Sequence, residues 1–250
     1  MSARKNVGII RDYGQSDHLF AVREAYRTIR TNICLSVIKE GCRKIVFTSS
    51  VQGEGKTVTA SNVAFSMSQT DMKVLLIDAD LRLSRVHKIL KLTNEKGLSN
   101  VLGRLCTFEE AVCHTKYTNL DVLCAGMKVP NPAELLASES MQKLLDKLGE
   151  IYDCIIVDTP PLNLVSDAMP IIKMTDGVII VVRQNYATYP GVQQVVEGLK
   201  MVDAKILGMV LNSVDSKEFS YSYKNGYGYG YGYSSYGASS GSKSSDDMLH

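Results

Sequence analysis

Apolar and polar residues alternate along the chain in blocks that predict buried strands separated by helices. Six runs rich in Val, Ile and Leu have the length and composition of strands covered on both faces. They are residues 44–49, 73–78, 119–124, 153–158, 177–182 and 206–211. Helices are expected at 58–68 and at 132–148, where a proline suits the first helical turn. This order predicts an α/β fold with a mostly parallel sheet and helices on both faces.

Two segments lie outside this alternation. Residues 17–40 form a long predicted helix, in which Ile29 and Ile33 are spaced for one apolar face. Residues 216–250 are rich in Gly, Ser and Tyr and almost lack aliphatic side chains, so we expect this tail to be disordered. The predicted organisation is an N-terminal arm at 1–16, an α/β domain at 17–215 and the tail at 216–250.

Composition and charge exclude several classes of protein. The formal net charge of +2 over 250 residues favours neither nucleic acid nor an acidic substrate as a partner. No run of about eighteen apolar residues occurs, so the sequence predicts no membrane span and no secretory signal, and hence a cytoplasmic protein. The six cysteines form no CxxC pair and are interpreted as reduced thiols, with a zinc or iron–sulfur site as the alternative.

A phosphate-binding loop is predicted where the first strand ends and the next helix begins, at SVQGEGKT (residues 50–57). Its glycines permit a tight turn that aims backbone N–H groups at anionic oxygens, and the following helix adds a partial positive charge. Lys56 can reach the β- and γ-phosphates of ATP, and the Thr57 hydroxyl can bind Mg²⁺. Ser50 stands where the first glycine of such loops is usual. The predicted nucleotide contacts are Gly53, Glu54, Gly55, Lys56, Thr57 and Val58.

Three aspartates are placed for a magnesium–phosphate site. Asp78 and Asp158 each end a predicted strand, and Asp80 follows two residues after the first of them. Because ligands of parallel sheets sit at the carboxyl ends of the strands, we expect these carboxylates beside the phosphate-binding loop. Asp158 fits the Walker B role, with a structural cap of the next turn as the alternative, and Asp80 alone could equally be a solvated loop charge. The predicted Mg²⁺ ligands, some of them acting through water, are Thr57, Asp78 and Asp158.

Several motifs together resemble one family. VLLIDADLR (74–82) resembles the second Walker motif of bacterial tyrosine kinases, the P-loop kinases that control capsule and exopolysaccharide synthesis. EAYRTIR (24–30) is similar to their E-x-x-R-x-x-R helix, IIVDTPP (155–161) to their Walker B segment, and PNPAELLAS (130–138) to a stretch common in the family. With the tyrosine-rich tail, the resemblance covers nearly the whole chain. It is greatest to the Gram-positive type, whose cytosolic kinase is separate from its membrane-spanning activator.

The resemblance implies an ATP-dependent protein-tyrosine autokinase that regulates the synthesis and export of a capsular or extracellular polysaccharide. It also implies that one aspartate of the D-x-D pair accepts the proton of the tyrosine hydroxyl, a role that we assign to Asp80. Lys56 would neutralise the charge that develops during transfer. Arg82 either supports the site or makes a surface salt bridge. The predicted catalytic residues are Lys56, Asp78 and Asp80.

The tail supplies the predicted phospho-acceptors, which are Tyr221, Tyr223, Tyr227, Tyr229, Tyr231, Tyr233 and Tyr236. A flexible segment from 216 to 236 has a root-mean-square span of roughly 25 Å, which is long enough for transfer between subunits. Each phosphotyrosine adds about −1.5 to −2 charges. We therefore expect the subunits to assemble when unphosphorylated and to separate after phosphorylation.

Partners follow from the resemblance. At helical spacing Glu24, Arg27 and Arg30 share one broad side, and the family motif implies that this side mediates ring-like self-association, with an ordinary solvated face as the alternative. The other implied partners are a membrane-spanning activator (a polysaccharide co-polymerase), which recruits the protein to the inner face of the plasma membrane, and a cognate protein-tyrosine phosphatase.

Two other functions remain open. One is a MinD- or ParA-like ATPase, although that group carries an extra lysine where this chain has Val51. The other is a non-catalytic, nucleotide-sensing regulator of the polysaccharide machinery.

Overall fold

The computed structural model describes residues 17–214, with side chains from Phe20 onward. The predicted arm at 1–16 and the tail at 216–250, with its acceptor tyrosines, lie outside the described residues. Internal contacts group the chain into two units, Met1–Ser213 and Val214–His250, and the α/β domain belongs to the first.

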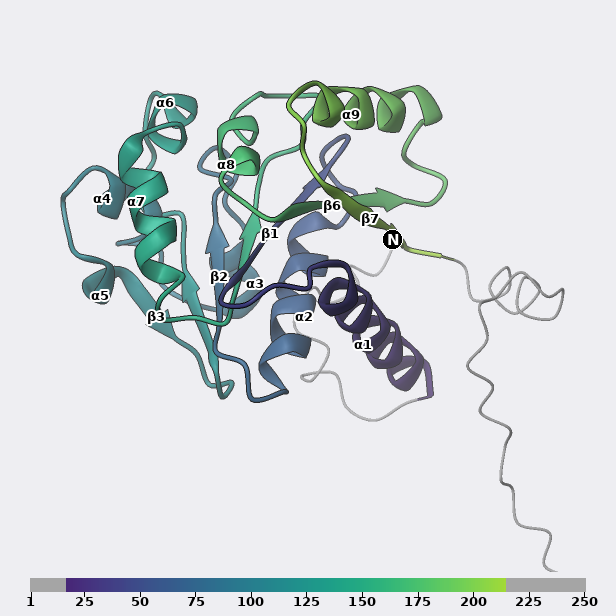
Figure 1. Cartoon of the computed structure of the whole chain (residues 1–250), viewed down its shortest axis with the longest axis horizontal. Helices are drawn as coiled ribbons and strands as arrows, with labels where there is room; N and C mark the ends of the chain where they lie inside the picture. Colours follow the sequence, from purple (N-terminus) through teal and green to yellow (C-terminus); the bar gives the residue numbers. More distant parts are fainter. Residues whose placement is uncertain (1–16, 215–250) are drawn as a thin grey trace, which may run out of the picture. The chain divides into compact units, whose positions relative to one another are not determined.

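Within the described residues the domain is built on one seven-stranded sheet in the order β3-β4-β2-β5-β1-β6-β7 (Figure 1). β3 pairs antiparallel with β4, and every other neighbouring pair is parallel. The strands are β1 (Arg43–Ser49), β2 (Val74–Asp78), β3 (Val112–His114), β4 (Leu120–Leu123), β5 (Cys154–Asp158), β6 (Gly177–Arg183) and β7 (Ile206–Asn212).

Helices cover both faces of the sheet, as the sequence predicted. The chain order of the helices is α1 (Asp17–Ser36), α2 (Lys56–Ser68), α3 (Val86–Leu90), α4 (Leu98–Leu102), α5 (Phe108–Ala111), α6 (Pro132–Leu136), α7 (Glu139–Leu148), α8 (Met169–Lys173) and α9 (Tyr189–Met201). Figure 1 shows α1 and α2 on one side of the sheet and α8 and α9 on the other.

Alternating side chains of the strands feed two separate cores. In β1, Ile45 and Phe47 pack with α1, α2 and α3, whereas Val46 packs with the helices from α4 onward. All three side chains are fully buried. Burying one side chain of this size stabilises a fold by about 1.5–3 kcal/mol. Because both faces are apolar, the strand reads as a continuous run of hydrophobic residues, which is why it was predictable.

The sequence prediction was wrong in three places. The run at 206–211, predicted as a buried strand, forms β7 at the edge of the sheet and is partly exposed to solvent. The single helix predicted at 132–148 is two helices, α6 and α7. Ser138 lies between them with extended backbone, and its hydroxyl accepts a hydrogen bond from the Met141 N–H at 3.3 Å, so that it caps α7. The three-residue edge strand β3 was not predicted, because Val-Cys-His carries no distinctive hydrophobic pattern.

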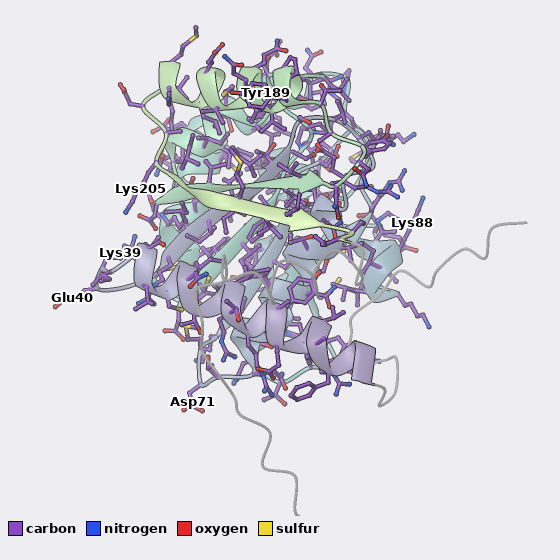
Figure 2. All side chains as sticks on the ribbon, turned by 90° about the vertical axis from the view of Figure 1, so that its right-hand side faces the viewer. Lys39, Glu40, Asp71, Lys88, Tyr189 and Lys205 are labelled. Carbon is purple, nitrogen blue, oxygen red and sulfur yellow. The ribbon has the colours of Figure 1, made fainter. Side chains whose placement is uncertain are left out.

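α1 lies beside α2 and β7, and ends four residues earlier than the predicted limit of 40. Ile33 is buried and Ile29 packs against the same core, as their spacing predicted. Two lysines labelled in Figure 2 fix the end of the helix. Lys205 donates to the Ser36 carbonyl at 3.0 Å, and Lys39 pairs with Asp176 at 2.7 Å.

The six cysteines form no disulfide bond in the structure. Among residues 17–214, no helix has the length and hydrophobicity needed to cross a membrane.

Candidate active site

The phosphate-binding loop and two of the predicted aspartates meet at one edge of the sheet. β5 lies between β1 and β2, and Asp158 at its end is in register with Asp78 of β2 and Phe47 of β1. The loop leaves β1 just beyond this level and leads into α2. Parallel topology therefore gathers groups that lie a hundred residues apart in sequence.

Left-handed backbone shapes the loop at two glycines. Gly53 has φ 94° and Gly55 has φ 90°, a region that disfavours any side chain. A Cβ atom on Gly55 would lie 2.0 Å from Nδ2 of Asn212, so this position also has no room for one. Gly55 is the N-cap of α2 and forms no side-chain cap. The first N–H groups of this thirteen-residue helix are thus left for an anionic ligand.

Glu54, one of the predicted nucleotide contacts, lines the pocket but has a buried side chain. It is 1% exposed, and its Oε2 accepts hydrogen bonds from the Ser50 hydroxyl at 2.9 Å and the Val51 N–H at 2.8 Å. Its carbonyl oxygen accepts a bond from Asn212 at 2.8 Å. The carboxylate therefore holds the shape of the loop, and Ser50 contributes a hydroxyl that the usual glycine would lack.

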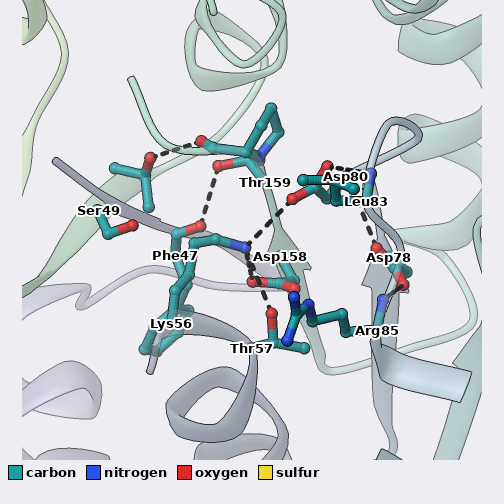
Figure 3. A network of polar contacts seen from close by, with 12 residues as sticks. Phe47, Ser49, Lys56, Thr57, Asp78, Asp80, Leu83, Arg85, Asp158 and Thr159 are labelled. Carbon is teal, nitrogen blue, oxygen red and sulfur yellow. Dashed lines mark hydrogen bonds and ion pairs between the residues drawn. The ribbon is translucent and has the colours of Figure 1, made fainter. Parts of the chain in front are cut away.

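Lys56 lies at the centre of a buried charge cluster, shown in Figure 3. Its ammonium donates to Oδ1 of Asp158 at 2.7 Å and lies 3.9 Å from Oδ2 of Asp80. The hydroxyl of Thr57 is 3.5 Å from the same nitrogen. Burial raises the pKa of Asp158, whereas the ammonium of Lys56 and the hydroxyl of Thr57 lower it. The predicted neighbours of the phosphates thus lie within reach of one another.

Asp78 and Asp80 have different surroundings. Asp78 accepts backbone hydrogen bonds at both oxygens, from the N–H of Asp80 at 3.2 Å and from those of Arg85 and Val86 at 3.1 Å. Burial, and then the nearby Asp158, raise the pKa of Asp78 to about 8. These contacts make Asp78 the residue that shapes the loop between β2 and α3.

Asp80 instead faces a pocket. Its Oδ1 accepts a hydrogen bond from the Leu83 N–H at 3.0 Å, and its Oδ2 is the oxygen that forms the ion pair with Lys56. The pocket has a volume of about 720 Å³. Its walls come from the phosphate-binding loop, the loop after β2 and the segment after β5. Of the D-x-D pair, Asp80 is therefore the member that lines the pocket.

The residues fit a hard cation without forming a complete cage. Among the described residues, Oδ2 of Asp158 is buried and has no hydrogen-bond partner. An orphaned carboxylate oxygen beside the Thr57 hydroxyl suits Mg²⁺, which usually retains waters and takes ligands from phosphate oxygens. No group of three or more His, Cys, Asp or Glu side chains within residues 17–214 could hold a metal by itself.

Arg82 forms the salt bridge that was one of its two predicted roles. Its Nε and Nη2 lie 2.5 and 3.1 Å from the two carboxylate oxygens of Asp167, which is buried. This bidentate pair ties the loop after β2 to the segment after β5, so that two walls of the pocket are held together.

Three residues that brace the phosphate-binding loop were missed. Arg183 donates to the Gly53 carbonyl at 3.2 Å, the Tyr186 hydroxyl donates to the Gln52 carbonyl at 3.0 Å, and Asn212 bonds Glu54 as described. They follow or end β6 and β7, and their place at carboxyl ends of strands was the one signal available in the sequence.

On α1, the three predicted interface residues are engaged within the chain. Glu24 and Arg27 form an ion pair at 2.5 Å with both side chains largely exposed. Arg30 donates to the Ser66 carbonyl of α2 at 2.8 Å. Glu24 and Arg27 are therefore available at the surface, whereas Arg30 also attaches α1 to the domain.

Comparison with known proteins decides the family. A family model described as an AAA domain matches residues 42–211. The chain is 40% identical to tyrosine-protein kinase YwqD of Bacillus subtilis over 189 residues, which is 76% of this chain and 80% of the relative. It is 34% identical to putative tyrosine-protein kinase CapB of Staphylococcus aureus over 201 residues, 80% and 88% of the two chains. The chain belongs to the bacterial tyrosine-kinase family.

Solved structures agree with this assignment. A chimerical protein CapA2B2 superposes with a TM-score of 0.77 at 34% identity, covering 83% of this chain and 89% of that one. The kinase domain of Escherichia coli tyrosine kinase ETK gives 0.73 at 31% identity, with coverage of 84% and 80%. MinD of Pyrococcus horikoshii, solved with Mg-ADP, gives 0.58 at 24% identity over 68% and 70%, and supports the P-loop NTPase fold alone.

Proposed function

We propose that this protein is an ATP-dependent protein-tyrosine kinase that phosphorylates the tyrosines of its own tail, between subunits, and so regulates synthesis and export of a capsular or extracellular polysaccharide. The observation that carries the proposal is the meeting of Lys56 and Asp80, 3.9 Å apart, in one pocket of about 720 Å³. A phosphate-binding cation and a pocket-facing carboxylate are the two groups that transfer to a hydroxyl requires. The family membership supports tyrosine as the acceptor.

The loop and α2 hold the nucleotide in this mechanism. Backbone N–H groups of residues 53–58 bind the α- and β-phosphates, and Lys56 reaches toward the γ-phosphate. Mg²⁺, when bound, would neutralise phosphate charge, held by the Thr57 hydroxyl and the orphaned oxygen of Asp158. Asp78 keeps the β2–α3 loop in place through its backbone hydrogen bonds.

Asp80 handles the proton. A tyrosine hydroxyl has a pKa of about 10 and is a weak nucleophile at neutral pH. Oδ2 of Asp80 accepts its proton while the phenolic oxygen forms a bond to the γ-phosphorus and the bond from that phosphorus to the β–γ bridging oxygen breaks. ADP leaves, and the phosphate remains on the tyrosine.

Assembly belongs to the same proposal. The exposed part of α1 with Glu24 and Arg27, together with Arg30, forms the contact between subunits of a ring-like oligomer. Phosphates added to the tail then repel neighbouring subunits and release them. A membrane-spanning activator brings the cytoplasmic kinase to the inner face of the plasma membrane, and a cognate protein-tyrosine phosphatase resets it. The kinship to capsule kinases such as CapB supports these partners.

The test is to incubate the full chain with Mg-ATP, with and without the cytosolic segment of the membrane-spanning partner, and to map phosphotyrosine by mass spectrometry. Phosphate is expected on the tail tyrosines, and Lys56→Met is expected to abolish it. Replacing the tail tyrosines by phenylalanine should remove the acceptors and leave ATP binding intact. Release of inorganic phosphate without any phosphotyrosine would refute the proposal and favour a MinD-like ATPase.

A further inference from the structure

Arg85 is a pocket residue to which the motifs assign no role. It lies in the loop between β2 and α3 and lines the same pocket as Lys56 and Thr57. Figure 3 shows its side chain extending from this loop toward Thr57 and Asp158. Lys88, one turn later, also lines the pocket, but Figure 2 shows it at the periphery of the molecule.

The backbone of Arg85 is firmly placed. Its N–H donates to Oδ2 of Asp78 at 3.1 Å, and it is the N-cap residue of α3. The next residue, Val86, is fully buried and donates to the same carboxylate oxygen. The guanidinium therefore extends from a fixed point, and this limits the entropy lost when it binds a ligand.

Arg85 supplies a positive charge that no carboxylate of the described residues neutralises. Lys56 is paired with Asp158 at 2.7 Å, and Arg82 is paired with Asp167. By contrast, the guanidinium of Arg85 forms no hydrogen bond or ion pair within residues 17–214. An unpaired guanidinium directed into a pocket is suited to an anionic ligand, above all to phosphate oxygens that its planar fork can bind in pairs.

The position of Arg85 indicates which phosphate it serves. The α- and β-phosphates belong to the wall made by the phosphate-binding loop and the start of α2. Arg85 belongs to a different wall, on the loop that also carries Asp80, the residue assigned to the acceptor hydroxyl. The group between these walls is the terminal phosphate.

We propose that Arg85 binds the terminal phosphoryl group of ATP and stabilises its charge during transfer to tyrosine, an inference that rests on the proposed kinase activity. Lys56 and Arg85 then approach the same group from two sides. The ammonium of Lys56 shares its charge with Asp158, so the unshared guanidinium carries the larger part of the discrimination between ATP and ADP.

Binding measurements on the full chain test this directly. Isothermal titration with Mg-ADP and with a non-hydrolysable Mg-ATP analogue would be compared for wild type, Arg85→Ala and Arg85→Lys. We expect Arg85→Ala to lower the affinity for the ATP analogue by about tenfold or more and to change the affinity for ADP by less than about twofold. Arg85→Lys keeps the positive charge but loses the planar pair of donors, so its affinity for the analogue should lie between those of wild type and Arg85→Ala.

Kinetics provide the second readout. The rate constant for tail phosphorylation at saturating ATP should fall by about 10²-fold in Arg85→Ala. Lys91→Asn is the matched control, because it removes a nearby exposed charge outside the pocket while asparagine tolerates the left-handed backbone found there (φ 57°). It should leave both affinities and the rate unchanged.

Three outcomes would overturn the assignment. An unchanged ratio of the two affinities together with an unchanged rate would leave Arg85 without a role in phosphate binding. Equal weakening of both nucleotides would make it a structural residue of the loop. Tighter binding of both would mean that the guanidinium obstructs the pocket. If wild type binds both nucleotides but makes no phosphotyrosine, the kinase proposal fails, while the affinity ratio still tests Arg85.

Discussion

The buried ion pair between Lys56 and Asp158 provides a sharp test of how the site is held together. The paired atoms are 2.7 Å apart, and the side chains are 7% and 1% exposed. Asp158→Ala removes the carboxylate but leaves the ammonium in place, and Asp80 at 3.9 Å is then the one carboxylate of the described residues within ion-pair distance. Because a buried charge without its partner is poorly solvated, we expect a large loss in the free energy of unfolding.

The magnitude follows from burial. Removing one partner of a buried pair costs about 3–5 kcal/mol. Asp80 retains part of the attraction for the ammonium, so the expected loss is near the lower end, about 3 kcal/mol. The pair Lys44–Asp146 is a matched control, since its atoms are 2.8 Å apart but the Asp146 side chain is 57% exposed. Asp146→Ala should cost only about 0–1 kcal/mol.

Urea denaturation of the full chain without nucleotide, followed by circular dichroism at neutral pH, measures both losses. The double variant Lys56→Met/Asp158→Leu should recover most of the stability, because neither charge then remains in the interior. If Asp158→Ala destabilises the chain no more than Asp146→Ala does, the ammonium is not desolvated and the reasoning is refuted.

Two further outcomes are expected. Burial raises the pKa of Asp78 from 3.8 to about 8, so the folded protein binds the proton of this carboxyl group more tightly than the unfolded chain does. This difference adds to the free energy of unfolding. The contribution is complete below about pH 4 and is lost as the pH rises to about 8. Asp78→Asn should flatten that dependence in urea denaturation at several pH values, and an unaltered slope would contradict the assignment. Gly55→Ala should abolish ATP binding in calorimetry, because its new Cβ would lie 2.0 Å from Asn212. Gly41→Ala, with φ 77° but open space around its Cβ, should retain binding, and equal binding by both variants would exclude the steric explanation.

The parts of the fold that could be predicted are those specified by local pattern. The central strands β1, β2, β4, β5 and β6 are largely apolar because helices cover both faces of the sheet, and their parallel connections bring the motifs to the same edge. β7 is an apolar run too, but it lies at the edge of the sheet and is partly exposed. β3 and the break between α6 and α7 depend instead on tertiary surroundings. β3 is a strand because it pairs with β4 at the edge, and the break reflects the capping geometry of Ser138.

The same division applies to the site. GEGKT and the aspartates are recognisable because each needs a given residue type at a given spacing. The sequence motif does not show that the Glu54 side chain is buried. That orientation depends on the donors Ser50 and Val51 and on Asn212, which is distant in sequence but hydrogen-bonded to the Glu54 carbonyl. Arg85 was missed for a similar reason, because an arginine in a charged loop is ordinary until its neighbours are found to be paired.

The three aspartates show how surroundings divide the work among identical side chains. Asp78 has both oxygens bonded to backbone N–H groups, so accepting a substrate proton would disturb the loop that it shapes. Asp158 is bonded to Lys56 through one oxygen and keeps the other buried and orphaned, which suits a metal ion better than a proton acceptor in contact with a tyrosine. One oxygen of Asp80 accepts a hydrogen bond from the Leu83 N–H, and the residue lines the pocket, where its other oxygen is available. Of the three, we therefore propose Asp80 as the aspartate that accepts the proton of a tyrosine hydroxyl, because it can do so without losing a contact on which the site depends.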